Sequence, residues 1–167
     1  MTSFTVREAR PDELDAAGRL VAEAYAAADF VGADAHGYLD TVRDARGRSR
    51  HCPILVAAEE GSESLLGSVT YVPGPGNPFA ELERPGEAGF RMLGVAPSAQ
   101  RRGVGEALVR ACIDRGRAAG RHGLAISTGP DMLPAHRLYE RLGFRRAPDR
   151  DFDPVPGVHL LAYTLAL

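Results

Sequence analysis

The chain has 167 residues, of which 44% are hydrophobic and 25% charged, and its formal net charge is −2. These values are ordinary for a globular protein, so we expect a single domain over residues 1–167 whose core needs no disulfide staples. Two cysteines, Cys52 and Cys112, exclude a disulfide scaffold and a four-cysteine zinc ribbon, and no apolar run is long enough for a membrane helix. The start of the chain lacks a signal-peptide pattern, which predicts a cytoplasmic protein.

Charged residues are distributed unevenly along the chain. Residues 1–83 contain seven Arg and fourteen Asp or Glu, a balance of −7, whereas residues 84–167 contain thirteen Arg and eight acids, a balance of +5. A basic half favours an anionic partner and an acidic half favours a cationic one. The small net charge and the lack of a basic, aromatic-rich run argue against a general nucleic-acid binder.

Hydrophobic periodicity and turn residues predict alternating strands and helices. The order of these elements predicts an α/β or α+β fold, a sheet with helices on its faces. A long segment in the middle of the chain is rich in Pro and Gly, so no regular element can run through it. We expect, in chain order, a strand Phe4–Ala9, a helix from Pro11 to about Asp29, a short helix Tyr38–Arg46, strands Ile54–Ala58 and Leu65–Val72, the loop 73–89, a strand Phe90–Val95, a helix Gly103–Ala119, a strand Leu124–Ser127, a helix Met132–Leu142, and last strands at Phe144 and Val158–Leu165.

The most informative segment joins the strand Phe90–Val95 to the longest expected helix. The first residues of that helix include Gly103 and Gly105. The first N–H groups of a helix have no partner within it and carry a partial positive charge. Glycines leave these donors open to a bulky anion such as a pyrophosphate, and Arg101 and Arg102 add formal positive charge. The segment therefore predicts an anion-binding turn.

Two familiar phosphate-binding motifs do not fit this turn. A dinucleotide-binding fingerprint needs a third glycine where Leu108 stands, and the acidic residue expected near residues 123–125 is absent. A Walker loop needs a Lys, and the chain has none. Close packing of the helix against its neighbours is the alternative explanation of the glycine pair.

The pattern Gln100-x-x-Gly103-x-Gly105, after the strand, resembles the acetyl-CoA-binding motif of the GNAT N-acetyltransferase superfamily. Residues 135–144, AHRLYERLGF, resemble the second signature of that family, and the two motifs stand in its order and at its spacing. The resemblance implies a GNAT-type mixed, mostly antiparallel sheet of six to seven strands flanked by about four helices. It also implies transfer of an acetyl group from acetyl-CoA to a primary amine, with no metal.

The resemblance also implies how acetyl-CoA binds. In the family the pyrophosphate lies on the N–H groups of the turn, and the pantetheine arm pairs like an extra strand with the end of the preceding strand, where Gly94 would let it approach closely. A backbone N–H of this strand can also polarise the thioester carbonyl. The family often has an Asn contact to the cofactor at the position of Met132, which cannot make it. The residues expected to bind the cofactor are Leu93, Gly94, Val95, Gln100, Arg101, Arg102, Gly103, Val104, Gly105 and Glu106.

Tyr139, in the second signature, is the residue expected to protonate the departing CoA thiolate, although its helical spacing also suits a core tyrosine. Glu87, just before the strand, is our candidate for the general base, with a solvated loop acid as the alternative. His36 is the second candidate for the base, and we interpret His136 as structural. Cysteines with apolar neighbours are typical of a core, so direct transfer in a ternary complex is preferred to an acyl-cysteine route.

The acidic first half of the chain favours a cationic acceptor, a primary amine on a small molecule or on a peptide N-terminus. We expect no nucleic-acid or membrane partner, and homodimers are common in the family. Two other function classes stay open: a non-catalytic acyl-CoA-binding sensor, against which the retained Tyr139 argues, and a binding protein for another nucleotide. The candidate residues of the acceptor cleft are Asp34, His36, Glu81, Glu83 and Glu87.

Overall fold

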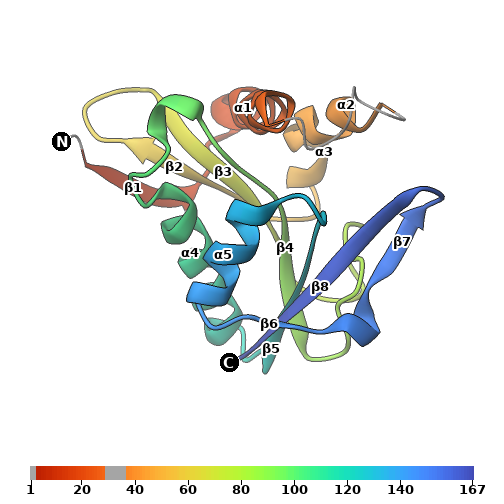
Figure 1. Ribbon diagram of the computed structural model, residues 1–167. Helices are drawn as coiled ribbons and strands as arrows, with labels where there is room; N and C mark the ends of the chain where they lie inside the picture. Colours follow the sequence, from red (N-terminus) through yellow and green to blue (C-terminus); the bar gives the residue numbers. More distant parts are fainter. Residues whose placement is uncertain (1–2, 29–36) are drawn as a thin grey trace. The chain divides into compact units, whose positions relative to one another are not determined.

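The computed structural model describes residues 3–28 and 37–167 of the chain. Strands and helices follow the expected order, and Figure 1 shows them along the sequence. The strands are β1 Phe4–Glu8, β2 Ile54–Glu59, β3 Leu65–Val72, β4 Glu87–Val95, β5 Gly123–Thr128, β6 Arg145–Arg146, β7 Phe152–Val155 and β8 Val158–Ala166. The α-helices are α1 Leu14–Ala27, α2 Tyr38–Arg43, α3 Ala45–Ser49, α4 Val104–Ala118 and α5 Leu133–Arg141. The short 3-10 helices are η1 Pro11–Glu13, η3 Pro97–Ala99 and η4 Pro148–Arg150.

The strands form one mixed sheet with the order β1-β2-β3-β4-β5-β8-β6, and β7 pairs with β8. Antiparallel pairing joins β1 to β2, β2 to β3, and β8 to β5, β6 and β7, whereas β4 and β5 run parallel. The mixed, mostly antiparallel sheet is thus confirmed. It has eight strands instead of six to seven, and the described residues form five α-helices instead of about four.

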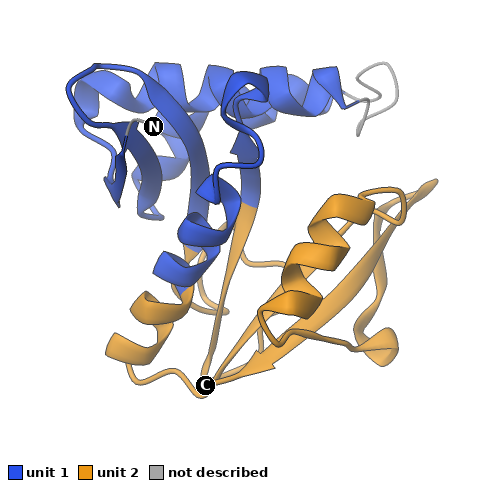
Figure 2. Cartoon of the chain, turned by 60° about the vertical axis from the view of Figure 1, so that its left-hand side comes forward, with its two compact units in different colours: residues 1–71, 92–112 blue, residues 72–91, 113–167 orange. Residues whose placement is uncertain are grey.

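The chain divides into two compact units, coloured separately in Figure 2. Unit 1 comprises residues 1–71 and 92–112, and unit 2 comprises residues 72–91 and 113–167. The chain passes from one unit to the other within β3, within β4 and within α4. The single domain expected over residues 1–167 stays a prediction.

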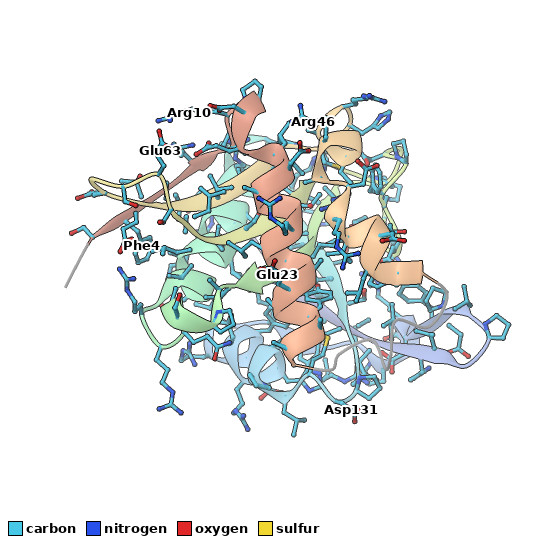
Figure 3. All side chains as sticks on the ribbon, turned by 90° about the horizontal axis from the view of Figure 1, so that it is seen from above. Phe4, Arg10, Glu23, Arg46, Glu63 and Asp131 are labelled. Carbon is cyan, nitrogen blue, oxygen red and sulfur yellow. The ribbon has the colours of Figure 1, made fainter. Side chains whose placement is uncertain are left out.

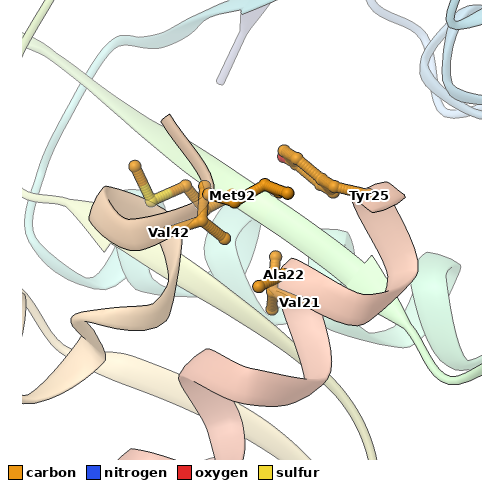
Figure 4. Close-up of a cluster of buried hydrophobic side chains, with 6 residues drawn as sticks. Val21, Ala22, Tyr25, Val42 and Met92 are labelled. Carbon is orange, nitrogen blue, oxygen red and sulfur yellow. The ribbon is translucent and has the colours of Figure 1, made fainter. Parts of the chain in front are cut away.

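In unit 1, α1 packs through the apolar face that its sequence spacing predicts. Its first two turns meet β2, where Leu14 and Ala17 lie in one buried cluster with Ile54 and Val56. Its later turns belong to a second buried cluster, shown in Figure 4, which joins α1 to α2 and β4. The buried members of that second cluster are Val21, Ala22, Tyr25, Leu39, Val42 and Met92.

The single helix expected over residues 38–46 is two helices, α2 and α3, that break at Asp44. Asp44 has a non-helical ψ of 57°, and its carboxylate accepts the N–H of Gly47 at 2.9 Å, which caps α3. Arg46 of α3 pairs with Asp15 at 3.1 Å, and Figure 3 shows it beside the first turn of α1. The break therefore lets α3 contact the start of α1.

Arg48 of α3 is buried, which is unusual for an arginine. Its guanidinium donates to the carbonyls of Thr41 and Val42 at 2.7 and 2.9 Å, and its Nε donates to Oγ1 of Thr70 at 3.1 Å. The last carbonyls of a helix have no partner within that helix. Arg48 thus donates hydrogen bonds to two of the last carbonyls of α2 and connects this helix to β3.

Two strands of unit 2 differ from the sequence-based expectation. β4 begins at Glu87, three residues before the expected start at Phe90. β7 was not expected, because Pro154 lies within its four residues. Proline lacks a backbone N–H and is tolerated in strands mainly at edges and irregularities, and β7 pairs with β8 through an irregular register.

Gly18 lets α1 approach the end of α2 closely. A Cβ built on Gly18 would lie 2.0 Å from the carbonyl oxygen of Arg43, a backbone atom that cannot move alone. We expect Gly18→Ala to lower the free energy of unfolding by about 1–3 kcal/mol, despite the better helix propensity of alanine. Urea denaturation checks this, with Gly76→Ala as control because nothing lies within 4 Å of its Cβ position. Equal stability of the two variants would contradict the close approach.

Candidate active site

The turn between β4 and α4, in unit 1, has the backbone that an anion site needs. Arg101 and Gly103 have left-handed φ values of 65° and 78°. The first helical hydrogen bond runs from the N–H of Ala107 to the carbonyl of Gly103 at 3.0 Å. Among the described residues, no hydrogen-bond acceptor is found for the N–H groups of Gly103, Val104 and Gly105. These donors precede a helix of 15 residues and are available to an anion.

The start of α4 is fixed by packing on β3. The side chain of Val104 is buried, and a Cβ at Gly67 would lie 2.8 Å from its Cγ1. No atom lies within 4 Å of the Cβ position of Gly103, so the turn is open there. The space at Gly103 fits the anion-binding explanation of that glycine, whereas the close packing at the helix start involves Gly67 of β3, which is not part of the glycine pair.

The two arginines of the turn differ in their surroundings. Arg102 is half-buried and pairs with Glu59, the last residue of β2, at 3.5 Å. Arg101 and Gln100 are exposed. Glu106, in the first turn of α4, lies 3.5 Å from Arg110. Much of the charge expected from Arg102 is therefore balanced by Glu59.

The residues expected to bind the pantetheine arm form the carboxyl end of β4. Leu93 and Val95 are half-buried, and Gly94 is buried. A Cβ at Gly94 would lie 3.0 Å from the Cα of Val21 in α1. The close approach of α1 therefore explains the glycine at this position, and the role of Gly94 in binding the cofactor arm stays a prediction.

Tyr139 of α5 lies in an aromatic cluster of unit 2 and is 4% exposed. Its ring centroid lies 5.7 Å from that of Phe90 on β4, 5.7 Å from that of Phe144 and 6.0 Å from that of Tyr163 on β8. These edge and tilted contacts are typical of stable aromatic packing. The ring is thus a core element, and the packing fixes the direction of its hydroxyl group.

The loop between β5 and α5 is closed by the side chains of Met132 and His136. The N–H of Gly129 approaches Sδ of Met132 at 3.4 Å, and the Nε2 of His136 lies 2.8 Å from the carbonyl of Gly129. Both side chains are therefore used within the loop. This agrees with the structural interpretation of His136.

Glu87 is a buried strand residue, and not the solvated loop acid that was the alternative to a general base. It is the first residue of β4, is 9% exposed, and forms a two-point ion pair with Arg150 at 2.7 and 3.0 Å. Burial alone would raise the pKa of the Glu87 carboxyl, but hydrogen bonds from Arg150 and from the N–H of Arg84 outweigh it and lower the pKa. A carboxylate so strongly paired is a poor proton acceptor, which argues against Glu87 as the general base; that role stays a prediction.

Glu81 and Glu83, expected in the acceptor cleft, lie near Glu87 in unit 2. Glu81 pairs with Arg91 of β4 at 2.8 Å and accepts a hydrogen bond from Ser127 of β5 at 3.3 Å. Glu83 is buried and accepts the N–H groups of Glu81 and Leu82. We call the three carboxylates and their two arginines the acid–arginine cluster: Glu81, Glu83, Glu87, Arg91 and Arg150.

Neither arginine of this cluster was predicted as a site residue from the sequence. Arg91 could have been found, because residues 87, 89 and 91 share one face of a strand that starts at Glu87. Arg150 could not, because it is the last residue of a 3-10 helix and stands 63 positions after Glu87. Thr128, at the end of β5, was also missed; its hydroxyl is buried and has no hydrogen-bond partner in the described part of the chain.

The remaining predictions concern His36, Asp34, the two cysteines, metal binding and membrane spans. His36 and Asp34 lie outside the described residues. Cys52 and Cys112 are both buried, as expected for core residues. Within residues 3–28 and 37–167 we find no group of three or more His, Cys, Asp or Glu that could hold a metal ion. No helix among the same residues is long and apolar enough to cross a membrane.

Comparison with known proteins identifies the family. The model of the acetyltransferase (GNAT) family matches residues 19–144, three quarters of the chain. The chain belongs to this family. The match includes the β4–α4 turn and the helix that carries Tyr139.

Solved structures of the GNAT type share the fold of this acetyltransferase-family chain. A GCN5-related N-acetyltransferase from Kribbella flavida is 24% identical, with a TM-score of 0.71 over 99% of this chain and 98% of that one. A GNAT-family acetyltransferase from Staphylococcus aureus Mu50 is 11% identical, with a TM-score of 0.75 over 99% of both chains. The yncA protein of Salmonella typhimurium, solved with its cofactor acetyl-CoA, is 21% identical, with a TM-score of 0.65 over 99% of this chain and 94% of that one.

Mycothiol acetyltransferase from Pseudarthrobacter chlorophenolicus is 46% identical to this chain over 55 residues. The match covers 33% of this chain and only 17% of that protein. It therefore supports a shared segment of an acetyltransferase and carries no information about the acceptor.

The ion pair between Glu87 and Arg150 predicts how stability depends on pH. Because the pKa of Glu87 is lowered in the folded state, its contribution is complete above the unfolded value of about 4.3 and is lost as the pH falls through the lowered folded value. We expect Glu87→Gln to cost about 3 kcal/mol of unfolding free energy near neutral pH and much less in acid.

Urea denaturation at neutral and acidic pH measures this difference. Glu63→Gln is the control, because Glu63 lies exposed in the turn between β2 and β3. A Glu87→Gln variant as stable as this control at neutral pH would show that the pair contributes little.

Proposed function

We propose that this protein is an N-acetyltransferase that moves an acetyl group from acetyl-CoA to a primary amine by direct attack in a ternary complex. The observation that carries the proposal is the open turn at the start of α4. There the N–H groups of Gly103, Val104 and Gly105 have no acceptor within residues 3–28 and 37–167, in a chain that belongs to the acetyltransferase family.

The residues of unit 1 fit the cofactor that the family implies. Main-chain N–H groups at a helix start bind a pyrophosphate without a lysine, and the open space at Gly103 leaves room for it. Arg101, which is exposed, adds positive charge, and Gln100, Arg102 and Glu106 complete the expected binding residues. The main chain of Leu93–Val95 would pair with the two amides of the pantetheine arm.

Acetyl-CoA supplies an activated acetyl thioester. The chain must then polarise the thioester carbonyl and return a proton to the sulfur. A backbone N–H at the end of β4 would perform the first task. Tyr139 would perform the second, because a phenol and a thiol exchange a proton readily within a hydrogen bond. The aromatic contacts of its ring hold that hydroxyl in one direction.

The acceptor is proposed to be a cationic amine on a small molecule or a peptide. The support is the balance of −7 over residues 1–83, and the acid–arginine cluster of unit 2, in which three carboxylates outnumber two guanidinium groups. An acidic lining attracts an ammonium group and raises its local concentration.

Release of CoA thiol, measured with acetyl-CoA and separate primary amines, tests the function. Suitable acceptors are kanamycin, spermidine, lysine and an alanine tripeptide. A thermal-shift comparison of CoA with ATP and NAD tests the turn, because a ligand at about 100 times its Kd stabilises by roughly 2.7 kcal/mol. Stabilisation by CoA without thiol release from any amine would support an acyl-CoA sensor instead.

Tyr139→Phe tests the proposed proton donor. The change removes one hydroxyl and keeps the ring that contacts Phe90 and Phe144. We expect kcat to fall at least about tenfold, while the Kd for acetyl-CoA stays nearly unchanged. Steady-state kinetics and calorimetry measure the two quantities. A fully active variant would remove Tyr139 from the mechanism.

Arg101→Glu tests the anion-binding turn. A reversed charge beside a polyphosphate should raise the Kd for CoA about tenfold or more, and the effect should shrink in high salt because the residue is exposed. Arg19→Glu is the control, since it makes the same change at an exposed position of α1. Equal CoA affinity of the two variants would place the phosphates elsewhere.

A further inference from the structure

The part of β4 that belongs to unit 2, residues 87–91, separates two groups of side chains. Successive residues of a strand point to opposite faces. On one face of β4, Phe90 meets the ring of Tyr139. On the other face, Glu87 and Arg91 belong to the acid–arginine cluster, and Gly89 lies against the carboxylate of Glu83. The proposed proton donor and the carboxylates therefore lie on opposite faces of one strand.

The acid–arginine cluster has three carboxylates but only two guanidinium groups. Glu81 pairs with Arg91 at 2.8 Å, and Glu87 pairs with Arg150 at 2.7 Å. Within the described residues, Glu83 forms no ion pair of its own. It is nevertheless 91% buried, since its exposed fraction is 9%. A buried carboxylate without a counterion is costly unless it can take up a proton.

The position of Glu83 is built into the loop and the strand. Its Oε2 accepts the N–H groups of Glu81 and Leu82 at 2.7 and 3.1 Å. Its Oε1 lies over Gly89, where a Cβ would come within 2.3 Å of it and within 2.5 Å of the carbonyl oxygen of Ala125. No hydrogen bond from another described residue reaches Oε1. The glycine thus leaves room for a carboxylate oxygen that accepts no hydrogen bond from another described residue, beside the last paired residues of β4 and β5.

We propose that Glu83 accepts the proton that the acceptor ammonium must lose before it attacks. The proposal rests on the proposed function and gives the role of the base to a carboxylate that, unlike Glu87, has no arginine partner among the described residues. Glu81 and Glu87 are each neutralised by an arginine, whereas Oε1 of Glu83 is left to accept.

The electrostatic surroundings of Glu83 agree with this role. Burial raises the pKa of its carboxyl above the ordinary value and outweighs the hydrogen bonds from the N–H groups of Glu83, Glu81 and Leu82, which lower it; the negative charge of Glu81 raises it further. Two positive groups lie nearby: the guanidinium of Arg150, which donates to the carbonyl of Leu82 at 2.6 Å and is held by Glu87, and that of Arg91, which is held by Glu81. From β5 the cluster meets uncharged groups, the carbonyl of Ala125 and the hydroxyl of Ser127.

The proton balance of the step is complete. An N–H bond of the ammonium breaks, and that proton passes to the Glu83 carboxylate and later to water. The freed lone pair forms the N–C bond to the acetyl group while the C–S bond breaks. The sulfur takes a proton from Tyr139, and the nitrogen gives up a second proton that restores the tyrosine. The products are a neutral amide, CoA thiol and one proton in solution.

The pH dependence of kcat at saturating spermidine distinguishes this role from a structural one. In the native protein, kcat should reach a plateau once Glu83 is ionised. In Glu83→Gln, kcat near neutral pH should fall about 100-fold, and it should rise about tenfold per pH unit because only the free amine reacts. The thermal shift caused by CoA should match that of the native protein, which shows that the variant is folded and binds the cofactor.

Glu81→Gln is the matched comparison on the same loop. It breaks the pair with Arg91 but keeps Glu83, so the plateau should remain and its edge should move to lower pH, because one neighbouring negative charge is lost. Glu83→Asp, which keeps a carboxylate, should retain a plateau at reduced kcat and serves if the Gln variant fails to fold.

Three results would overturn the proposal. A Glu83→Gln variant with native kcat, or one that is slow but keeps the plateau, would show that Glu83 acts through structure alone; the acetyltransferase function would then still stand. If an aspartate at this position loses the plateau, the carboxylate is not the proton acceptor. Absence of CoA thiol release by the native protein with every amine would remove the proposed function, and this assignment with it.

Discussion

The alternation of side chains along β4 is the constraint on which the proposed chemistry depends. One strand, which belongs partly to each unit, carries Phe90 toward the ring of Tyr139 and carries Glu87 and Arg91 toward the acid–arginine cluster. Because this alternation is fixed by backbone geometry, a group that gives a proton and a group that takes one can be kept apart by the strand itself. Separate environments let two titratable groups keep different proton affinities.

The β4–α4 turn uses the main chain where many phosphate sites use side chains. Arg101 and Gly103 adopt left-handed conformations, and the N–H groups that follow have no acceptor among the described residues. Arg102, which directly precedes Gly103, is balanced by Glu59. The helix start would therefore provide most of the attraction for the proposed pyrophosphate in a chain without lysine.

Local patterns predicted the fold well because they report local forces. The spacing of Leu14, Ala17, Val21 and Tyr25 predicted the buried face of α1, and the glycines after β4 predicted the start of α4. The pairing of Glu87 with Arg150 joins residues 63 positions apart, so no local pattern could show it. The second reason for a glycine at position 94 was missed in the same way, since its closeness to Val21 appears only after α1 packs on β4. β7 was missed because its proline opposes strand formation, and pairing with β8 overrides that preference.

An anion-binding turn made of main-chain amides tolerates many changes of sequence. Every amino acid except proline carries the same N–H group, so most substitutions along the turn leave the donors in place, provided that Gly103 keeps its left-handed backbone. Chains that share as little as 11% of their residues with this one retain the same architecture. The side chains around the acceptor can then change between family members, and with them the amine that is accepted, while the turn proposed to bind the coenzyme stays the same.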